Sequence, residues 1–320
     1  MATTSVNTGG GFVQIPQLVR SFFSREVFIL AQPRLRFLQF AKVRRDLQAV
    51  RGKTIVFVKY NNLVGGGAIS EQDNIVPEGL SASEVTITVT EHANAIQVTE
   101  YLLKTSLYNT MEDASRLLAN NFSVVLDSQL RDAVLATTNV VYGNEVANSS
   151  AMDTTSKFNA KTVRAMVEVL ANANTPKING EFYVCFASPH QLRSLREDPE
   201  WLEAHKYMGR RQLYLGEAGM YEGVIFIETT QMANAGGSPG NLTKMTSAQV
   251  VAKYGGTFSP TYGYEAVMFG DNTLAWGIAS DVELRDDGVV DLGRKHTLGW
   301  YGIWGSGLLE NSYAVRALTV

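Results

Sequence analysis

The feature that most constrains this chain is a stretch of about 40 residues, from 99 to 140, without glycine or proline. Apolar residues recur in it at steps of three or four, which is the spacing of one helix face. This face contains Leu103, Leu107, Met111, Ala114, Leu118, Phe122, Leu126, Leu130 and Ala133. The opposite face, predicted to be partly exposed, carries Lys104, Asn109, Glu112, Asn120 and Asp127. An unbroken helix here would be about 60 Å long. A helix of this length acts as a spine and needs neighbours to cover it.

Two strands are predicted before the helix, at residues 54–60 and 84–91. The first is rich in β-branched and aromatic residues, and the second alternates Val or Ile with Thr at period two. The connection between them exceeds 20 residues and is polar and rich in turn formers. Because such long connections are unusual inside a compact domain and are usually functional, we predict a long β-hairpin that projects from the body.

Charge is distributed unevenly along the chain. The whole sequence has a net charge of -3 and a pI of about 5.9, which argues against a protein built around nucleic-acid binding. The first 60 residues nevertheless hold ten Lys and Arg against two acidic residues, a net charge of +8, and the remainder carries -11. This basic arm would be attracted to an acidic surface, either a neighbouring copy or nucleic acid. The alternative is a solvated face whose arginine stems cover apolar neighbours.

Residues 141–156 are rich in Asn, Ser and Thr and predict a boundary, after which an α/β unit follows. Asn159 is a helix-capping residue, and Ser188-Pro189 and Asp198-Pro199 each predict a helix start. We predict strands at residues 182–187, 223–228, 248–254, 264–269 and 274–278, a hairpin turning at 286–288, and a last strand at 313–320 that returns to the spine.

Motifs for chemistry are mostly absent. Residues 236–240 match G-x-S-x-G around Ser238, but loop formers surround the serine where a strand and a helix are required. The four histidines have no metal-ligand spacing, so we expect neither metal nor cofactor. Cys185, the single cysteine, is predicted to be a small buried hydrophobe. The cluster of Trp300, Tyr301 and Trp304 could stack on bases, although core or subunit-interface packing is favoured. No apolar stretch is long enough for a membrane helix, so no membrane partner is expected.

The order of these segments carries a resemblance. A basic arm, the strand 54–60, a loop over 71–79, a Thr-rich strand 85–90 and a spine helix containing Leu126-Asp127 together resemble the tailed-bacteriophage major capsid proteins, most closely those of podophage type. The sequence Leu-Gly-Trp-Tyr-Gly at residues 298–302 is similar to a glycine–tryptophan motif near the end of that family.

The resemblance implies an α+β phage major-capsid fold of the Hong Kong phage type. Its parts would be an N-terminal arm (1–53), an extended β-hairpin loop (54–91), a peripheral domain with the spine helix (92–143 and 294–320) and an axial domain (144–293). Some members of the family crosslink covalently through a loop lysine, but residues 61–80 contain none.

The resemblance also implies a function and partners. The protein would be a structural subunit and not an enzyme, with copies forming hexamers and pentamers of an icosahedral shell around double-stranded DNA. Portal, scaffolding or decoration proteins would be further partners, the protein would reside in the virion capsid, and assembly would take place in the host cytoplasm. Candidate residues for inter-subunit or DNA contacts are Arg34, Arg36, Arg44, Arg45, Tyr60, Glu71 and Trp300.

Three other classes stay open on the sequence alone. An encapsulin-type compartment of the same fold would contain protein cargo instead of a genome. A polymeric subunit of a tail or surface layer would form no closed shell. A serine hydrolase would use Ser238.

Overall fold

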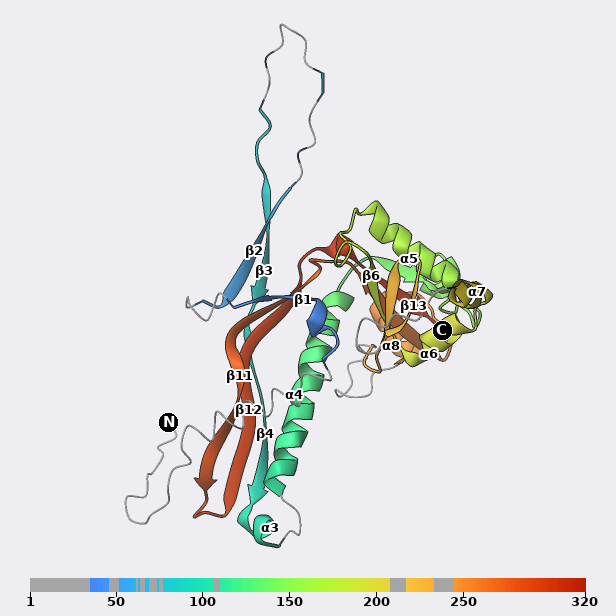
Figure 1. Cartoon of the computed structure of the whole chain (residues 1–320). Coiled ribbons are helices and arrows are strands. Elements are labelled where there is room, and N and C mark those ends of the chain that lie inside the picture. Colours follow the sequence, from blue (N-terminus) through green and yellow to red (C-terminus); the bar gives the residue numbers. More distant parts are fainter. Residues whose placement is uncertain are drawn as a thin grey trace. The chain divides into compact units, whose positions relative to one another are not determined.

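A computed structural model of the chain describes residues 35–45, 52–61, 63, 67–68, 74, 77–105, 110–207, 217–232 and 244–320. The described residues divide into two compact units (Figure 1). The first contains Leu35 and the described residues within 91–126 and 280–303, and the second contains the described residues within 36–90, 127–279 and 304–320. The domain boundaries given above stay a prediction.

The first unit is built from long strands and the spine helix. Its elements are β4 (Thr90–Thr99), α3 (Glu100–Thr105), the first part of α4 (Thr110–Leu135), and the facing parts of β11 (Leu274–Val290) and β12 (Lys295–Leu308). The sheet order is β1-β11-β12-β4, where β1 is Ala41–Arg44. β4 is therefore an edge strand of this sheet.

The predicted helix exists, but its predicted length is wrong. β4 extends to Thr99, α3 ends at Thr105, and α4 covers 26 residues, about 39 Å. At its C-terminal end the helix stops before Thr137, whose hydroxyl donates to the carbonyl oxygen of Ala314 at 3.0 Å. Tertiary hydrogen bonding thus overrides helix propensity there.

The apolar face predicted for the helix is confirmed, because Leu118, Phe122, Leu126 and Leu130 are buried. The assignment of Asp127 to the exposed face is wrong. A second row at i, i+4 spacing is buried as well, although most of it is polar: Ser115, Ala119, Ser123, Asp127, Arg131 and Leu135. The buried arc of α4 is therefore wider than its apolar residues indicate.

The second unit is organised around a sheet of order β5-β13-β10-β6-β8-β7. These strands are β5 (Val140–Tyr142), β6 (Tyr183–Ala187), β7 (Glu217–Tyr221), β8 (Val224–Glu228), β10 (Tyr262–Phe269) and β13 (Ala314–Thr319), and β9 (Met245–Thr246) pairs with β10. The predicted last strand, β13, pairs with β10 and β5 in the interior of the sheet.

Helices cover one face of this sheet. They are α5 (Ala160–Asn172), α6 (Pro189–Arg196) and α7 (Pro199–Tyr207), and their apolar side chains form one core with Tyr183, Cys185 and Ala187 of β6. The Asn159 side chain accepts from the amide of Thr162, and Ser188 closes a capping box before Pro189, as predicted. The prediction that Cys185 is buried is confirmed.

Two local predictions are wrong. Residues 248–254 form not a strand but α8 (Ser247–Tyr254), because Thr246 and Gln249 form a reciprocal capping box that starts a helix. The hairpin does not turn at 286–288: β11 continues to Val290 and the turn lies at 291–294. Gly288, at φ 78°, is instead accommodated within the strand, with its amide held by Asp286 Oδ1 at 2.8 Å.

Candidate assembly surfaces

The predicted β-hairpin is formed by β2 (Thr54–Tyr60) and β3 (Ala82–Thr88), which pair in antiparallel register (Figure 1). Ile55 stands opposite Ile87 on one face, and both are buried. Three glycines of the neighbouring strands, Gly277, Gly305 and Gly307, make room for these two side chains, because a Cβ on each would approach them within about 3 Å. The base of the hairpin is thus fixed to the second unit.

The other face of the hairpin carries a row of apolar side chains on β2 that is exposed in the single chain, opposite the more polar β3. Val56, Val58 and Tyr60 alternate along β2 on this face, with exposed fractions of 47%, 56% and 66%. We call these three residues the hairpin row. A row of adjacent exposed apolar side chains on a two-stranded ribbon is typical of a surface that another molecule covers.

A charged contact also ties the loop-side end of β2 to its own unit. Lys59 forms an ion pair with Glu310, just before the short 3-10 turn at Asn311–Tyr313. Burial alone would raise the pKa of Glu310, but hydrogen bonds from Lys59 and Ser312 lower it below its usual value. The ion pair therefore holds β2 against the segment that leads into β13.

Within the second unit, the basic arm is described from Arg36 to Arg45. Its strand β1 pairs in parallel with the start of β11. Phe37 is fully buried and stacks on Phe186 of β6, with ring centroids 4.0 Å apart. The backbone amides of Arg36 and Phe37 both donate to Oδ1 of Asp127, at 3.0 and 3.1 Å. The arm is therefore anchored by packing and by hydrogen bonds, on the sheet face opposite α5.

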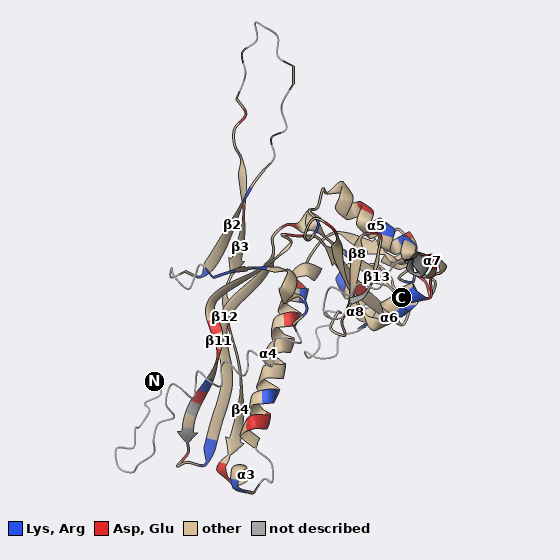
Figure 2. Ribbon diagram, in the orientation of Figure 1, with Lys and Arg blue, Asp and Glu red and all other residues tan. Residues whose placement is uncertain are grey.

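The candidate arginines have different surroundings. Arg36 is half-buried and donates to the carbonyl oxygen of Glu228. Arg44 and Arg45 are exposed, and the Arg44 guanidinium lies 5.6 Å from the ring centroid of Phe57. In Figure 2, acidic and basic positions alternate along α4 and around α5, whereas β1 carries only basic ones. Arg34 and Glu71 lie outside the described residues.

The Trp300 side chain packs and forms a hydrogen bond inside the first unit. Its side chain is 2% exposed, meets Phe122 edge to face, and donates from Nε1 to Asn121 Oδ1 at 3.1 Å. Asn94 of β4 donates to the same Asn121 oxygen at 2.9 Å. Within the single chain Trp300 is therefore a core residue, as the favoured interpretation of this cluster predicts. Contact of Trp300 with another subunit or with DNA stays a prediction.

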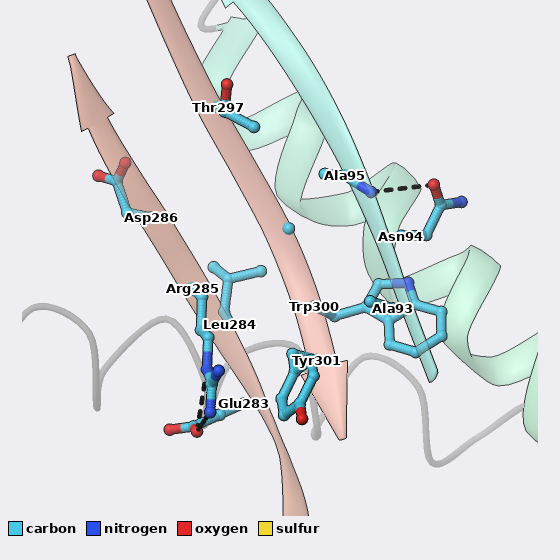
Figure 3. Close-up of a pocket in the computed structure, with 11 residues that line it drawn as sticks. Ala93, Asn94, Ala95, Glu283, Leu284, Arg285, Asp286, Thr297, Trp300 and Tyr301 are labelled. Carbon is cyan, nitrogen blue, oxygen red and sulfur yellow. Dashed lines mark hydrogen bonds and ion pairs between the residues drawn. The ribbon is translucent and has the colours of Figure 1, made fainter. Parts of the chain in front are cut away.

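A shallow groove of about 850 Å³ lies on the sheet of the first unit (Figure 3). Its floor is made of small residues, with Ala93 and Ala95 on β4 and Gly299 on β12. Along its rim Arg285 is paired with Glu283 at 2.6 Å and lies 4.0 Å from the ring centroid of Tyr301. Gly299 is required by close approach, since a Cβ there would lie 2.9 Å from the Asn94 carbonyl oxygen.

The described residues offer little for catalysis. No group of three or more His, Cys, Asp or Glu in this part of the chain could hold a metal ion. Burial raises the pKa of the Cys185 thiol, which disfavours the reactive thiolate. Ser238 lies outside the described residues. None of the described helices is both long and apolar enough to cross a membrane.

Sequence reasoning missed several of the residues that build these surfaces. The apolar pattern of the helix places Asp127 on its exposed face, and no sequence motif marks Asn94, Asn121 or Glu310. Only the i, i+4 row through Asp127 offered a signal, because it lies directly beside the apolar row of the same helix.

Part of the chain matches a known protein family. Residues 126–283 match the family described as phage capsid protein. No curated protein sequence matches the chain significantly.

Several solved structures share the fold. The chain is similar to the capsid of Ralstonia phage GP4, with a TM-score of 0.67 and 15% identity over 88% of this chain and 87% of the other. It is similar to the capsid subunit of cyanophage Pam1, with a TM-score of 0.65 and 17% identity over 100% and 97%. It is also similar to a virus-like particle from Pyrococcus furiosus, with a TM-score of 0.55 and 10% identity over 93% and 99%. The α+β capsid fold predicted from the sequence is thereby confirmed.

Proposed function

We propose that this chain is a phage capsid protein and that it forms the hexamers and pentamers of an icosahedral shell that encloses the double-stranded DNA of a tailed phage. Its role as the major capsid protein is structural and not enzymatic, and its place is the virion capsid. The proposal concerns how copies associate and what they enclose.

The observation that carries the proposal is the two-sided hairpin. One face is fixed to its own subunit through Ile55 and Ile87, while the hairpin row on the other face is exposed. A two-stranded ribbon buries too little to be stable alone, and exposed strand edges favour pairing with another chain. A second copy that covers the hairpin row would satisfy both needs, and repetition of this head-to-tail contact around a ring closes it.

The basic arm supports an interior that contains DNA. Lys42, Arg44 and Arg45 are exposed on or beside β1, and the first 60 residues carry a net charge of +8. Phosphates or acidic patches of a neighbouring copy would be attracted to this segment without sequence specificity. Portal, scaffolding and decoration proteins are further proposed partners, and assembly is proposed to occur in the host cytoplasm.

The test is expression of the chain alone, followed by sedimentation and electron microscopy. The wild type should form capsomers or particles far heavier than 35.1 kDa. Replacing residues 61–80 by a two-residue turn keeps β2 and β3 but removes the tip, and should give a folded subunit that forms no shells. A wild-type monomer at micromolar concentration under all salt and crowding conditions would contradict the proposal.

A closed compartment for protein cargo is the second candidate, and the shared fold with the Pyrococcus furiosus virus-like particle favours keeping it. The content of purified particles separates the two functions. Particles from infected cells that hold a genome support the phage capsid, whereas a defined protein cargo without DNA supports the compartment. The serine-hydrolase alternative gains nothing from the family match, and esterase turnover lost on Ser238→Ala would be needed to revive it.

A further inference from the structure

Asp127 is a buried carboxylate at the point where the arm joins the body of the second unit. Its side chain lies on α4 and is 4% exposed. Its Oδ1 atom accepts the amides of Arg36 and Phe37, the two residues just before the 3-10 turn at Leu38–Phe40. A single oxygen thus accepts two successive backbone amides of the arm, beside the packing of Phe37 and the pairing of β1 with β11.

The two arginines nearest this carboxylate are committed to other acceptors. Arg36 donates from Nη1 to the carbonyl oxygen of Glu228. Arg131, itself 2% exposed, donates to the carbonyl oxygen of Gln231 at 2.8 Å and from Nε and Nη2 to Asp132 at 2.8 and 2.6 Å. Their positive charges act on Asp127 only through space, so its negative charge is stabilised chiefly by two backbone amides.

We propose that Asp127 is a proton-operated latch for the arm: uptake of a proton by this carboxyl strengthens the attachment of the arm to α4, and loss of the proton weakens it. The protonated side chain keeps a carbonyl oxygen that can accept both amides. Protonation removes the cost of holding an incompletely compensated charge away from water. An arm that detaches would return Asp127 to solvent, where the charge carries no such cost.

The direction of the effect follows from linkage. Burial raises the pKa of Asp127 from 3.8 to about 6, and the amides of Phe37 and Arg36 and the charges of Arg36 and Arg131 lower it only partly. The attached state therefore binds the proton more tightly than the detached state. Attachment is weakest above pH 6, and its equilibrium constant rises as the pH falls, by about a hundredfold once the pH is below 3.8.

The surrounding charged groups do not supply this response. The cations that face Asp127 are Arg36 on the arm and Arg131 on α4, and arginine is not an acid–base group of the physiological range. Asp132 is paired with Arg131 and its side chain is 41% exposed, and Glu228 contributes its backbone oxygen to the contact with Arg36. Asp127 is thus the buried acid that titrates between the arm and α4.

Hydrogen exchange of the full-length chain, measured on peptides covering residues 35–45, tests the latch. After correction for the intrinsic pH dependence of exchange, arm protection in the wild type should rise more than tenfold from pH 7.5 to pH 4.5, relative to peptides from β6. Asp127→Asn keeps an acceptor oxygen but does not titrate, so its arm protection should not change with pH. Asp113→Asn, at an exposed acid on the same helix, should behave like the wild type.

Two results would overturn the latch. The first is wild-type arm protection that stays constant or falls on acidification. This result is obtained on the wild type alone, so it does not depend on whether a variant folds. The other is an Asp127→Asn chain whose arm protection rises with acid as the wild type does, because another group would then be responsible. The latch concerns a single subunit, so it stands or falls independently of shell formation.

Discussion

Gly305 lies against the backbone of Thr88, so closely that a Cβ on residue 305 would stand 2.4 Å from the Thr88 carbonyl oxygen. Since backbone cannot move aside as a flexible side chain can, Gly305→Ala should force the base of the hairpin away from β12. We expect a loss of about 2–3 kcal/mol in the free energy of unfolding, measured by urea denaturation of the unassembled subunit.

Gly79→Ala is the matched control, because no atom lies within 4 Å of a Cβ at that position. It should change the unfolding free energy by less than about 0.5 kcal/mol. Equal stability of the two variants would show that β12 does not approach β3 as described.

The hairpin row should be required for assembly but not for folding. Changing Val56 and Val58 to Thr preserves strand propensity and shape while adding two hydroxyls to a surface that is exposed in the single chain. Subunit stability should change by less than about 1 kcal/mol, while the protein concentration needed for particles should rise at least tenfold. Light scattering against protein concentration measures this. The control is Thr86→Val on the same face, which adds apolar surface and should not weaken assembly.

The exposed arginines of the arm should act by long-range attraction. Arg44→Gln with Arg45→Gln removes two charges and keeps most of each side-chain stem. At low salt the double variant should assemble more slowly or retain DNA less well, and the wild type should approach its behaviour as ionic strength rises, because exposed charges are screened beyond about 8 Å at physiological salt. Particle yield and nucleic-acid content, followed over a salt series, measure the effect.

Arg36→Gln provides a contrast, since the Arg36 side chain donates to the Glu228 carbonyl oxygen inside its own subunit. Its effect should appear in subunit stability and should persist at high salt. If the Arg44/Arg45 variant assembles and retains DNA as well as the wild type at low salt, these two arginines act through packing and not through charge.

Trp300 should contribute to subunit stability through the hydrogen bond from its indole nitrogen. Trp300→Phe keeps an aromatic ring against Phe122 but loses the donor to Asn121, so we expect a loss of about 1–3 kcal/mol from the bond and the smaller ring. The chain has four tryptophans, so the Trp300 signal is the part of the fluorescence that Trp300→Phe removes, and acrylamide should quench this part weakly in shells and in free subunits alike. Strong quenching that disappears on addition of DNA would instead indicate base stacking.

The sequence predicted those parts of the fold that local chemistry determines. Residues 54–60 form a strand with the predicted bounds, and Asn159 and Ser188 cap helices where expected, because each signal depends on neighbouring residues alone. One failure was local as well, because a capping signal was not recognised in the sequence. Residues 248–254 alternate poorly enough to suit either state, and the capping box at Thr246 selected the helix.

The assembly surfaces were predictable in outline but not in detail. Charge counting located the basic arm, and the turn-rich loop located the hairpin. No local pattern, however, indicates that the Asp127 carboxylate would be buried against amides about 90 positions earlier in the chain. The glycines at 299, 305 and 307 permit close approach of strands in the structure, and no local pattern indicates which backbone or side chain each of them faces.

The pairing of β13 with β5 and β10 has a consequence for the timing of folding. Arg316 lies in register with Val140, so the strand order of the second unit cannot be completed until residues 314–319 have left the ribosome. Contacts this distant in sequence slow folding, because a long loop must close first. The two hairpin strands are synthesised early, before the glycines of β11 and β12 against which Ile55 and Ile87 pack. Nascent chains therefore pass through an interval in which the hairpin strands exist without the sheet that anchors them. The rate of translation relative to sheet closure sets how long their apolar side chains stay exposed to neighbouring nascent chains.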